Sequence, residues 1–216
     1  MPGKTATVTE ISELAPRVIQ LTIAFPEGGL HFTPGQYINI HLSDGIVRAY
    51  TIASAPERPE AVQLCVRLGE GHGAAALRKL ETGAAVRVDG PVGRFVLPSE
   101  KRDVVFLAGD TGIAPVRSII LHMLATKDPR KITVLYEPDG KNILYSGDFD
   151  PMARDGAIRH ESGAIEVLIE RNRKLLSEAR LMIAGFDPFL RRAQDTLRAA
   201  GMKLDGAIVE SFGALP

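Results

Sequence analysis

The chain of 216 residues lacks the features that mark several classes of protein. It has one cysteine, no tryptophan and a formal net charge of zero. One thiol forms no internal disulfide, structural zinc site or iron–sulfur cluster, and a balanced charge attracts neither nucleic acid nor an anionic membrane. No apolar run approaches the roughly 20 residues of a membrane span, and the N-terminus lacks the apolar segment of a secretory signal. We therefore expect a cytoplasmic protein with no nucleic-acid partner, no membrane span and, since its histidines are scattered, no metal site.

Up to about residue 98 the sequence has the pattern of an all-β domain. Short runs that alternate apolar and polar residues are separated by clusters of glycine and proline, which is typical of an antiparallel barrel. Residues 73–83 have helical spacing and are predicted to cap the barrel. Residues 84–97 are predicted to form two short strands around a Gly–Pro corner. We expect one barrel domain over residues 1–98.

Beyond residue 103 strands alternate with helices, which predicts a parallel sheet with crossover connections. Apolar runs at residues 104–109 and 131–137 are typical of buried strands. The other expected elements are helices at 114–128 and 188–201 and strands at 180–186 and 206–212. We therefore expect a second, α/β domain over residues 103–216.

A loop of small residues, Gly-Asp-Thr-Gly at 109–112, follows the first of these buried strands. It lies at the carboxyl end of the strand, where parallel sheets bind ligands, and Pro115 suits the first turn of the next helix. Glycines let a phosphate approach the backbone, but a tight strand-to-helix turn explains the same residues. A similar loop begins at Gly185, which favours a ligand held between the two loops.

The segment Arg-Ala-Tyr-Thr, residues 48–51, carries a second candidate site. Arg48 and Tyr50 lie on one face because side chains alternate along a strand. An arginine can bind a phosphate through two N–H groups, a tyrosine ring can stack on a flat ligand, and Thr51 offers a hydroxyl. A barrel strand with a surface arginine and a core tyrosine explains the same pattern, so these residues alone leave both interpretations open.

Six stretches together resemble the ferredoxin–NADP reductase superfamily, in order and over essentially the whole chain. They are FTPGQYINIHL, RAYT, VDGPVGRFVLP, GDTGIAPVRS, AGFDPFLRRAQDTLRAAGM and VESFG. The resemblance implies an N-terminal six-stranded antiparallel Greek-key barrel that binds FAD and a C-terminal parallel-sheet domain that binds NAD(P)H, without a fused iron–sulfur domain. It also implies a flavoprotein reductase, an enzyme whose cofactors perform the hydride transfer themselves.

The resemblance further implies roles for individual residues. Arg48 would bind the flavin pyrophosphate, Tyr50 would pack on the isoalloxazine ring, and Thr51 would hydrogen-bond near its reactive nitrogen. Thr51 and Glu210 are the implied catalytic residues. The other implied FAD contacts are Val66, Arg67, Leu68, Gly73, Ala74 and Phe212. The implied NAD(P) contacts are Gly109, Asp110, Thr111, Gly112, Pro115, Glu137, Gly185, Phe186 and Asp187.

Three positions depart from the family pattern. Ala184 stands where the family often has a cysteine, and Ala74 where it usually has serine or threonine. Glu137 stands where a 2′-phosphate would call for positive charge, so the sequence favours NADH and leaves NADPH possible. An ordinary solvated loop charge explains Glu137 nearly as well.

We expect electrons to pass from NAD(P)H through FAD to a separate acceptor, such as a ferredoxin, a flavodoxin, an oxygenase component or a ferric compound. The alternative is a non-catalytic or regulatory flavin-binding subunit that has lost productive nicotinamide binding. Ala184 and the short third crossover of the second domain would favour that alternative.

Overall fold

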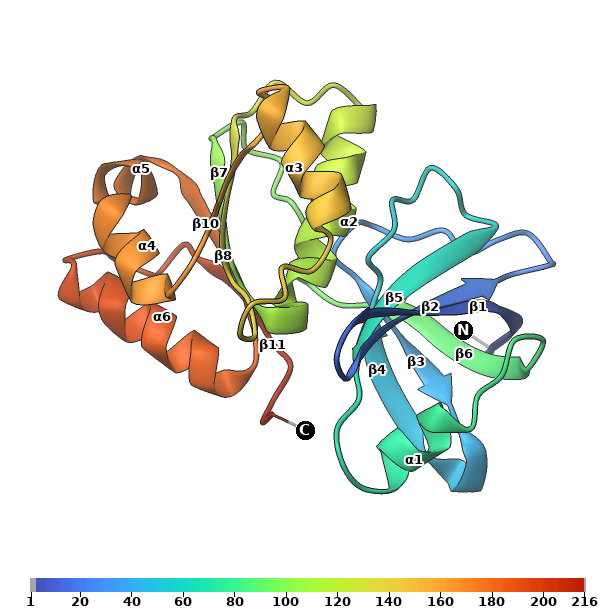
Figure 1. Ribbon diagram of the computed structural model, residues 1–216. Helices are drawn as coiled ribbons and strands as arrows, with labels where there is room; N and C mark the ends of the chain where they lie inside the picture. The colour runs from blue at the N-terminus through green and yellow to red at the C-terminus, as the bar shows by residue number, and fades with distance from the viewer. Residues whose placement is uncertain (1–2, 216) are drawn as a thin grey trace. The chain divides into compact units, whose positions relative to one another are not determined.

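The computed structural model describes residues 3–215, which divide into two compact units (Figure 1). The first takes in the chain up to Leu97 together with residues 117–122. The second takes in Pro98–Val116 and Met123–Leu215. Each unit is built on its own sheet.

The first unit is a six-stranded antiparallel barrel. Its elements are β1 (Lys4–Ala15), β2 (Val18–Ala24), β3 (Tyr37–His41), the 3₁₀ turn η1 (Ser43–Gly45), β4 (Val47–Thr51), β5 (Ala61–Arg67), α1 (His72–Arg78) and β6 (Ala85–Val92). The strands run in the order β4-β3-β6-β1-β2-β5, and an isolated bridge between Ile52 and Leu64 joins the two outer strands. The predicted antiparallel barrel is therefore confirmed.

The core of the barrel follows from the alternation of side chains along its strands. On β3, Ile38 and Ile40 are fully buried while their neighbours are partly exposed. The helix α1 adds Ala76 and Leu77 to the same core, so it covers the barrel as the sequence predicts. Burying one such large aliphatic side chain contributes roughly 1.5–3 kcal/mol, which makes this core the main stabilisation of the unit.

The structure corrects the expectation of two strands within residues 84–97. Only one strand forms there, β6 over Ala85–Val92, and it continues through the cis Gly90–Pro91 peptide bond, whereas residues 93–97 form no strand. The pairing of β6 with β3 shifts register between Tyr37 and Asn39 and so accommodates the irregular pair. The Gly–Pro pair is thus an irregularity inside one strand and not a corner between two.

The second unit is a five-stranded parallel sheet with helices on both faces. Its elements are β7 (Val104–Gly109), the 3₁₀ turn η2 (Asp110–Gly112), α2 (Ile113–Ala125), β8 (Ile132–Glu137), α3 (Ser146–Arg154), β9 (Arg159–Ser162), α4 (Ile165–Arg171), α5 (Arg173–Glu178), β10 (Arg180–Gly185), α6 (Asp187–Ala199) and β11 (Ile208–Ser211). The order β11-β10-β7-β8-β9 places β7 in the centre, where every residue of the strand is buried. The predicted parallel sheet is confirmed.

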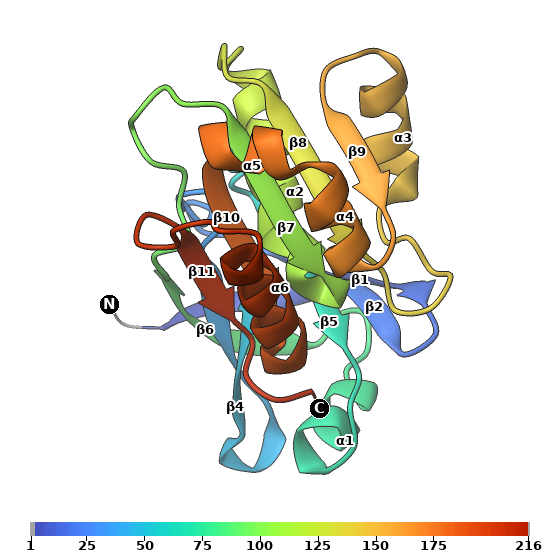
Figure 2. The same cartoon turned by 90° about the vertical axis from the view of Figure 1, so that its left-hand side faces the viewer.

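The helices divide between the two faces of this sheet. Figure 2 shows α4, α5 and α6 in front of the sheet and α2 and α3 behind it. The front face forms one core from strand residues such as Leu107 and Ile183 and helix residues such as Ile165, Leu190 and Leu197. Three of these elements, α3, α4 and α5, and the strand β9 were not predicted, and they lie in the charged segment between β8 and β10.

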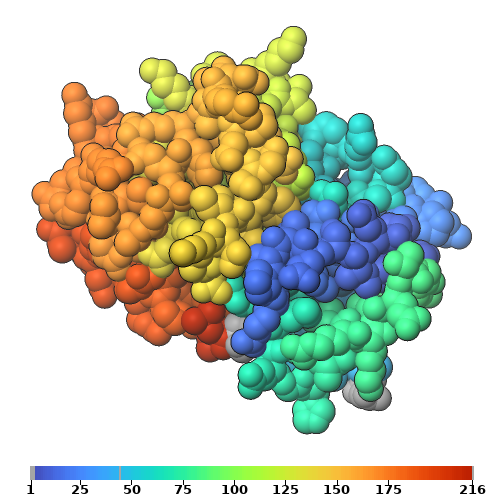
Figure 3. All heavy atoms as spheres, viewed as in Figure 1, coloured from blue at the N-terminus to red at the C-terminus, as the bar shows by residue number. Residues whose placement is uncertain are grey.

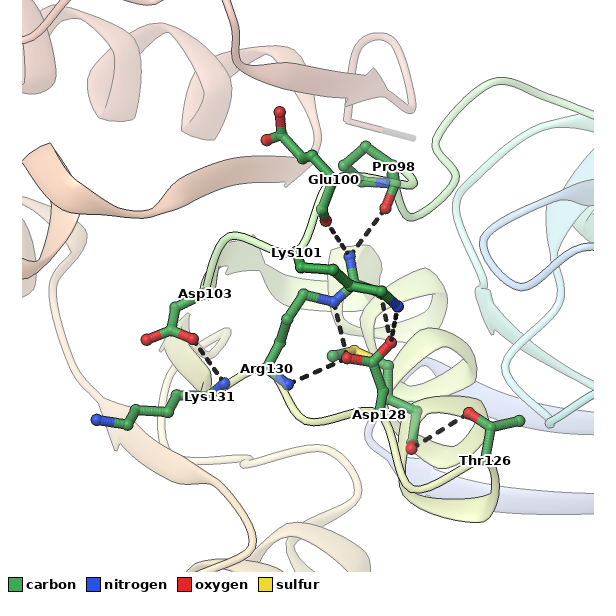
Figure 4. Close-up of polar contacts among 9 residues, drawn as sticks. Pro98, Glu100, Lys101, Asp103, Thr126, Asp128, Arg130 and Lys131 are labelled. Carbon is green, nitrogen blue, oxygen red and sulfur yellow. Dashed lines mark hydrogen bonds and ion pairs between the residues drawn. The ribbon is translucent and has the colours of Figure 1, made fainter.

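A buried arginine, Arg130, forms hydrogen bonds with the segment at the beginning of the second unit (Figure 4). Arg130 is only 7% exposed, and its Nη1 donates to the carbonyl oxygens of Pro98 and Glu100 at 2.8 and 2.9 Å. Its Nε and Nη2 donate to Asp128 at 2.8 and 2.6 Å. These charge-assisted bonds hold the pKa of Asp128 well below its usual range and fix the segment that leads into β7.

On the face drawn in Figure 3, the elements that were not predicted form a large part of the visible surface of the second unit. Residues of α3 to α5, orange in Figure 3, cover much of the surface that the unit presents in that view. None of the helices within residues 3–215 is long and apolar enough to cross a membrane.

Candidate functional site

In the first unit, the structure brings Arg48 of β4 to the first turn of α1. Arg48 lies opposite Ile40 of β3, and its Nη1 donates to the carbonyl of Val47 at 2.9 Å. A Cβ added at Gly73 would lie 2.7 Å from Arg48 Nε and 3.0 Å from Cζ. The guanidinium therefore packs directly on the bare backbone of Gly73. A cation next to main-chain N–H groups at the start of a helix is a suitable place for a phosphate group.

Tyr50 and Thr51 continue the same strand. Tyr50 is half-buried against the barrel core, and burial raises the pKa of its phenol to about 12, with Arg48 acting in the opposite direction. The phenol is thus neutral at all physiological pH values. Thr51 is 8% exposed and lies opposite Tyr37. The strand thus carries a cation and a neutral aromatic ring on one face, at Arg48 and Tyr50, and a largely buried hydroxyl on the other, at Thr51.

The next predicted group, Val66 to Leu68, lies at the end of β5. The Val66 side chain is fully buried in the barrel core, so only its main chain is available to a ligand. Leu68 N donates to the carbonyl of Arg17 at 2.7 Å, and Arg17 Nε donates back to the carbonyl of Leu68 at 3.2 Å. Ala74 is buried within α1. These residues can serve a ligand mainly through shape and main-chain groups.

In the second unit, both small-residue loops lie at the carboxyl edge of the sheet. The chain runs from β7 to β8 and β9 on one side and then crosses to β10 and β11 on the other. The point between β7 and β10 is therefore the topological switch point, where open parallel sheets bind ligands. Residues 109–112 follow β7 and residues 185–187 follow β10, so the fold brings the two loops together as expected.

The glycines of these loops are required by packing between protein groups. A Cβ at Gly109 would overlap the ring of Phe189, and one at Gly185 would lie 2.8 Å from Cδ1 of the same ring. A Cβ at Gly112 would overlap the carbonyl group of Ala184. The glycine content therefore explains how the loops approach each other and does not by itself indicate a ligand.

The other predicted residues of the first loop have ordinary structural roles as well. Asp110 has a φ of 53°, a left-handed conformation that aspartate tolerates better than most residues. Thr111 is 3% exposed, and Pro115 is the third residue of α2, where its missing N–H leaves no helix bond unmade. This loop can contribute main-chain groups and little side-chain chemistry.

The second loop is tied to the end of β11. Asp187 N donates to the carbonyl of Gly213 at 2.8 Å, and Ser211 Oγ donates to Asp187 Oδ1 at 2.6 Å. Phe186 and Phe212 meet edge to face with ring centroids 5.7 Å apart. These contacts fix the residues around Gly185, and Ser211 is a member of this network that the sequence did not reveal.

Glu210 lies on the outer strand β11, paired with Ala184 of β10. Burial raises the pKa of its carboxyl group above the usual value. The side chain therefore retains its proton to a higher pH than a solvated glutamate does. Carboxyl groups whose pKa is shifted by burial are common at functional sites and also occur in purely structural positions.

Glu137 has protein partners that the sequence did not reveal. It lies at the end of β8 beside Gly109, and its Oε2 accepts a hydrogen bond from Ile165 N at 2.8 Å, at the start of α4. Its Oε1 is paired with Arg192 of α6, whose Nη1 also binds Glu166 at 3.1 Å. The carboxylate is thus a helix cap and an ion-pair partner, and it is not an ordinary solvated charge.

Comparison with known proteins supplies the family. Residues 5–97 match the model of the oxidoreductase FAD-binding domain. The chain is 35% identical over 144 residues to the reductase component DmpP of phenol 2-monooxygenase from Pseudomonas sp., an alignment that covers 64% of this chain and 40% of that protein. It is 31% identical over 164 residues to ferredoxin–NADP reductase B from Sorangium cellulosum, covering 72% of this chain and 67% of that protein.

A solved structure agrees with the fold of the whole chain. The ferredoxin NADP⁺ reductase from Neisseria gonorrhoeae with bound FAD and NADP superposes with a TM-score of 0.83 at 20% identity, covering 98% of this chain and 99% of that one. The chain spans only about two fifths of the length of the first curated relatives, 40% and 43% in two cases. The sequence match, the antiparallel barrel and the parallel sheet together show that the chain belongs to the ferredoxin–NADP reductase superfamily.

Proposed function

We propose that the protein is a flavoprotein reductase that passes electrons from NAD(P)H through FAD to a separate acceptor. The observation that carries this proposal is the packing of Arg48 on Gly73, within the barrel that matches the FAD-binding model. The packing brings a cation into direct contact with a main-chain segment that carries no side chain. A pyrophosphate needs both.

The barrel residues fit FAD in the following way. Arg48 and the main chain at Gly73 would hold the pyrophosphate, and the neutral ring of Tyr50 would pack on the flavin. The hydroxyl of Thr51 and the main chain of residues 66–68 would orient it. When bound, FAD accepts a hydride and releases electrons, which is chemistry that no side chain of this chain supplies. We assign this role to residues 1–98.

We assign nicotinamide nucleotide binding to residues 103–216. The loops at 109–112 and 185–187 meet at the switch point, and the contacts of Asp187 with Ser211 and Gly213 keep the second loop in place. Phe186, whose ring packs edge to face on that of Phe212, would exclude water from the nicotinamide. Burial raises the pKa of the Glu210 carboxyl group, and we propose that this group lies beside the nicotinamide site. Ala184, fully buried in β10, offers no side chain for this chemistry.

We propose NADH as the preferred nucleotide. Glu137 and Glu166 both neutralise Arg192, so the carboxyl edge presents a paired cation and not a free one for a 2′-phosphate. A carboxylate has about four lone-pair sites, so Glu137 retains acceptor capacity for a ribose hydroxyl beside its present partners. NADPH is the second substrate in this proposal.

The acceptor is proposed to be a separate molecule. The chain has one cysteine and so carries no iron–sulfur cluster of its own. Two relatives are named as reductase components, of phenol 2-monooxygenase and of terephthalate 1,2-dioxygenase, and a third is named ferredoxin–NADP reductase. Because these relatives are named as reductases, the alternative of a non-catalytic flavin-binding subunit is not favoured. An oxygenase component or a ferredoxin is the acceptor class that we propose.

An anaerobic titration of the FAD-loaded protein tests the proposal. We expect NADH to bleach the visible flavin absorbance at a lower concentration than NADPH. A protein that retains FAD but is bleached by neither nucleotide would contradict the reductase assignment. The variant Arg48→Gln should lose FAD, whereas Arg58→Gln, which removes an equivalent charge elsewhere in the barrel unit, should retain it.

A further inference from the structure

The second unit has a hollow at the amino edge of its parallel sheet, opposite the edge that carries the loops described above. Its volume of about 650 Å³ lies within the range of roughly 300–1,000 Å³ that small-molecule sites occupy. It is bordered by α5, the start of β10 and the loop between α6 and β11. In Figure 2 the arrowhead of β7 points away from α5, which lies toward this amino edge.

The side chains that line this hollow are strongly basic. They include Arg102, Arg173, Lys174, Arg180 and Lys203, and no aspartate or glutamate is among them. Two of the five have acidic partners outside the hollow, Arg173 with Glu170 and Arg180 with Glu100. Within residues 3–215 the other three, Arg102, Lys174 and Lys203, make no salt bridge. This group is called the basic hollow below.

One of the cations is held in a fixed position. Arg180 Nε donates to Glu100 Oε1 at 2.5 Å, and its Nη1 donates to the carbonyl of Gly206. Glu100 raises the pKa of Arg180, and the arginine side chain is 20% exposed. These bonds orient the guanidinium before any ligand arrives, which lowers the entropy lost when a ligand binds.

The dipole of helix α6 would stabilise only part of the positive charge around the basic hollow. The carboxyl end of α6, at Ala199, lies near the hollow, and a helix end carries about half a negative charge that attracts one cation. Glu100 interacts with both Arg180 and Arg102, so it balances part of the remaining charge, whereas Lys174 and Lys203 make no salt bridge within residues 3–215 and exceed what that half charge can balance. Their mutual repulsion is relieved by an anion placed among them.

The floor of the basic hollow is apolar. Leu176 and Leu181 are buried, and Met202 is half-buried beside them. Leu176 and Leu181 belong to the hydrophobic core of the unit, and Met202 packs against that core. The protein itself therefore covers these apolar side chains, and the exposed basic side chains are the groups that the hollow offers to a ligand.

We propose that the basic hollow binds a small anion that carries at least two negative charges as phosphate or carboxylate. This site is separate from the FAD and nucleotide residues and does not depend on the proposed reductase function. Its position at the opposite edge of the sheet makes it a second ligand site on the same unit.

Isothermal titration of the full chain in 150 mM salt tests this proposal, with phenyl phosphate and benzene-1,3-dicarboxylate as the two probes. We expect at least one probe to bind with a stoichiometry of one. The double variant Lys174→Gln/Lys203→Gln should weaken that binding at least tenfold. Its matched control, Lys79→Gln/Lys127→Gln, removes two exposed lysines elsewhere and should change the affinity less than twofold.

The outcomes separate the possible explanations. Tighter binding of phenyl phosphate or of the dicarboxylate identifies the anionic group. Equal weakening in both double variants, or none in either, overturns the proposal, because the anion then lies elsewhere. Binding of an acidic peptide such as octaglutamate with no binding of either probe also overturns it and identifies a surface for a protein. Circular dichroism confirms that the variants fold, and Arg102→Gln provides a second, independent variant of the hollow.

Discussion

At the scale of single residues, the position of the Arg48 guanidinium depends on the absence of a side chain at Gly73. A methyl group at position 73 would lie 2.7 Å from Arg48 Nε, so Gly73→Ala must displace the guanidinium. A charge-assisted hydrogen bond contributes about 1.5–3 kcal/mol, so we expect the affinity for FAD to fall about tenfold or more. Flavin fluorescence quenching measures that affinity.

The matched control for this prediction is Gly147→Ala. Gly147 also lies in a helix, and an added Cβ there meets no atom within 4 Å. The affinity of the Gly147→Ala variant for FAD should equal that of the unmodified protein. Equal affinities in both variants would show that the Arg48–Gly73 contact does not hold the cofactor.

The pair of Glu137 and Arg192 leads to a prediction about the choice of nucleotide. Glu137→Gln keeps the shape of the side chain but removes one of the two acidic charges that pair with Arg192, and Glu166 remains as the other partner. A guanidinium with one partner fewer attracts a 2′-phosphate more strongly, so the ratio of the NADH to the NADPH dissociation constant should rise about fivefold, which corresponds to about 1 kcal/mol. Titration of nucleotide fluorescence gives both constants.

Glu170→Gln provides the comparison for this change. It removes one acidic charge from an exposed pair with Arg173 on the same unit. That variant should leave the nucleotide ratio unchanged. A fivefold change in both variants would indicate a general charge effect and not a role of Glu137.

Some contacts of single residues could not be predicted from the sequence. Gly109 and Gly185 were predicted to adjoin a ligand, and the structure places them against Phe189, whose approach depends on the packing of α6. The partner of Glu137 is 55 residues away, and no spacing rule connects the two positions. By contrast, the resemblance predicted Arg48 and Gly73 as members of one site, and the fold brings them into contact.

At the scale of elements, Arg130 connects the turn after α2 to the segment before β7. Its side chain is 4% exposed and that of Asp128 is 10% exposed, so Arg130→Ala leaves a buried carboxylate without its main partner. Breaking a buried pair costs about 3–5 kcal/mol, and we expect a loss of about 3 kcal/mol in the free energy of unfolding. Urea denaturation measures it.

The control for this prediction is the variant Lys101→Ala. Lys101 pairs with the same Asp128 at 3.5 Å, but its side chain is 67% exposed. Lys101→Ala should cost less than about 1 kcal/mol, as exposed pairs do. If both variants lost the same stability, burial would not be the reason for the effect of Arg130.

The same pair sets a dependence on pH. Arg130 holds the pKa of Asp128 below its usual range, so the pair contributes its full stability above the unfolded pKa of about 3.9. That contribution declines as the pH falls from about 4 toward the lower folded pKa. The difference in unfolding free energy between the unmodified protein and Asp128→Asn should therefore be constant from neutral pH to about pH 4 and shrink below it. A difference that grew on acidification would contradict this assignment.

The predicted elements and the missed ones differ in their sequence patterns. Strands such as β7 and helices such as α6 were predicted because apolar runs or clear turn residues mark them. The helices α4 and α5 were missed, although Ile165, Leu168, Ile169 and Leu176 recur at helical spacing, because charged residues separate them. The strand β9 has four residues and no fully buried position, so a sequence gives little sign of it.

At the scale of the whole molecule, two units with separate cores predict separate responses to ligands. FAD at 100 times its dissociation constant should stabilise the first unit by about 2.7 kcal/mol. Scanning calorimetry of the full chain should show that FAD raises one transition and leaves the other nearly unchanged. If FAD moved both transitions equally, the two units would unfold as one.

The two sheets also differ in how they protect their outer strands. An exposed edge is a template for pairing with another chain. In the parallel sheet both edge strands, β9 and β11, have only four residues and carry charges such as Arg159 and Glu210. In the barrel, the Ile52–Leu64 bridge and the hydrogen bond from Ala53 N to the carbonyl of Gln63 close the gap between β4 and β5. Loss of that short closure would create two edges at once, so resistance of the barrel to aggregation depends on very few main-chain contacts.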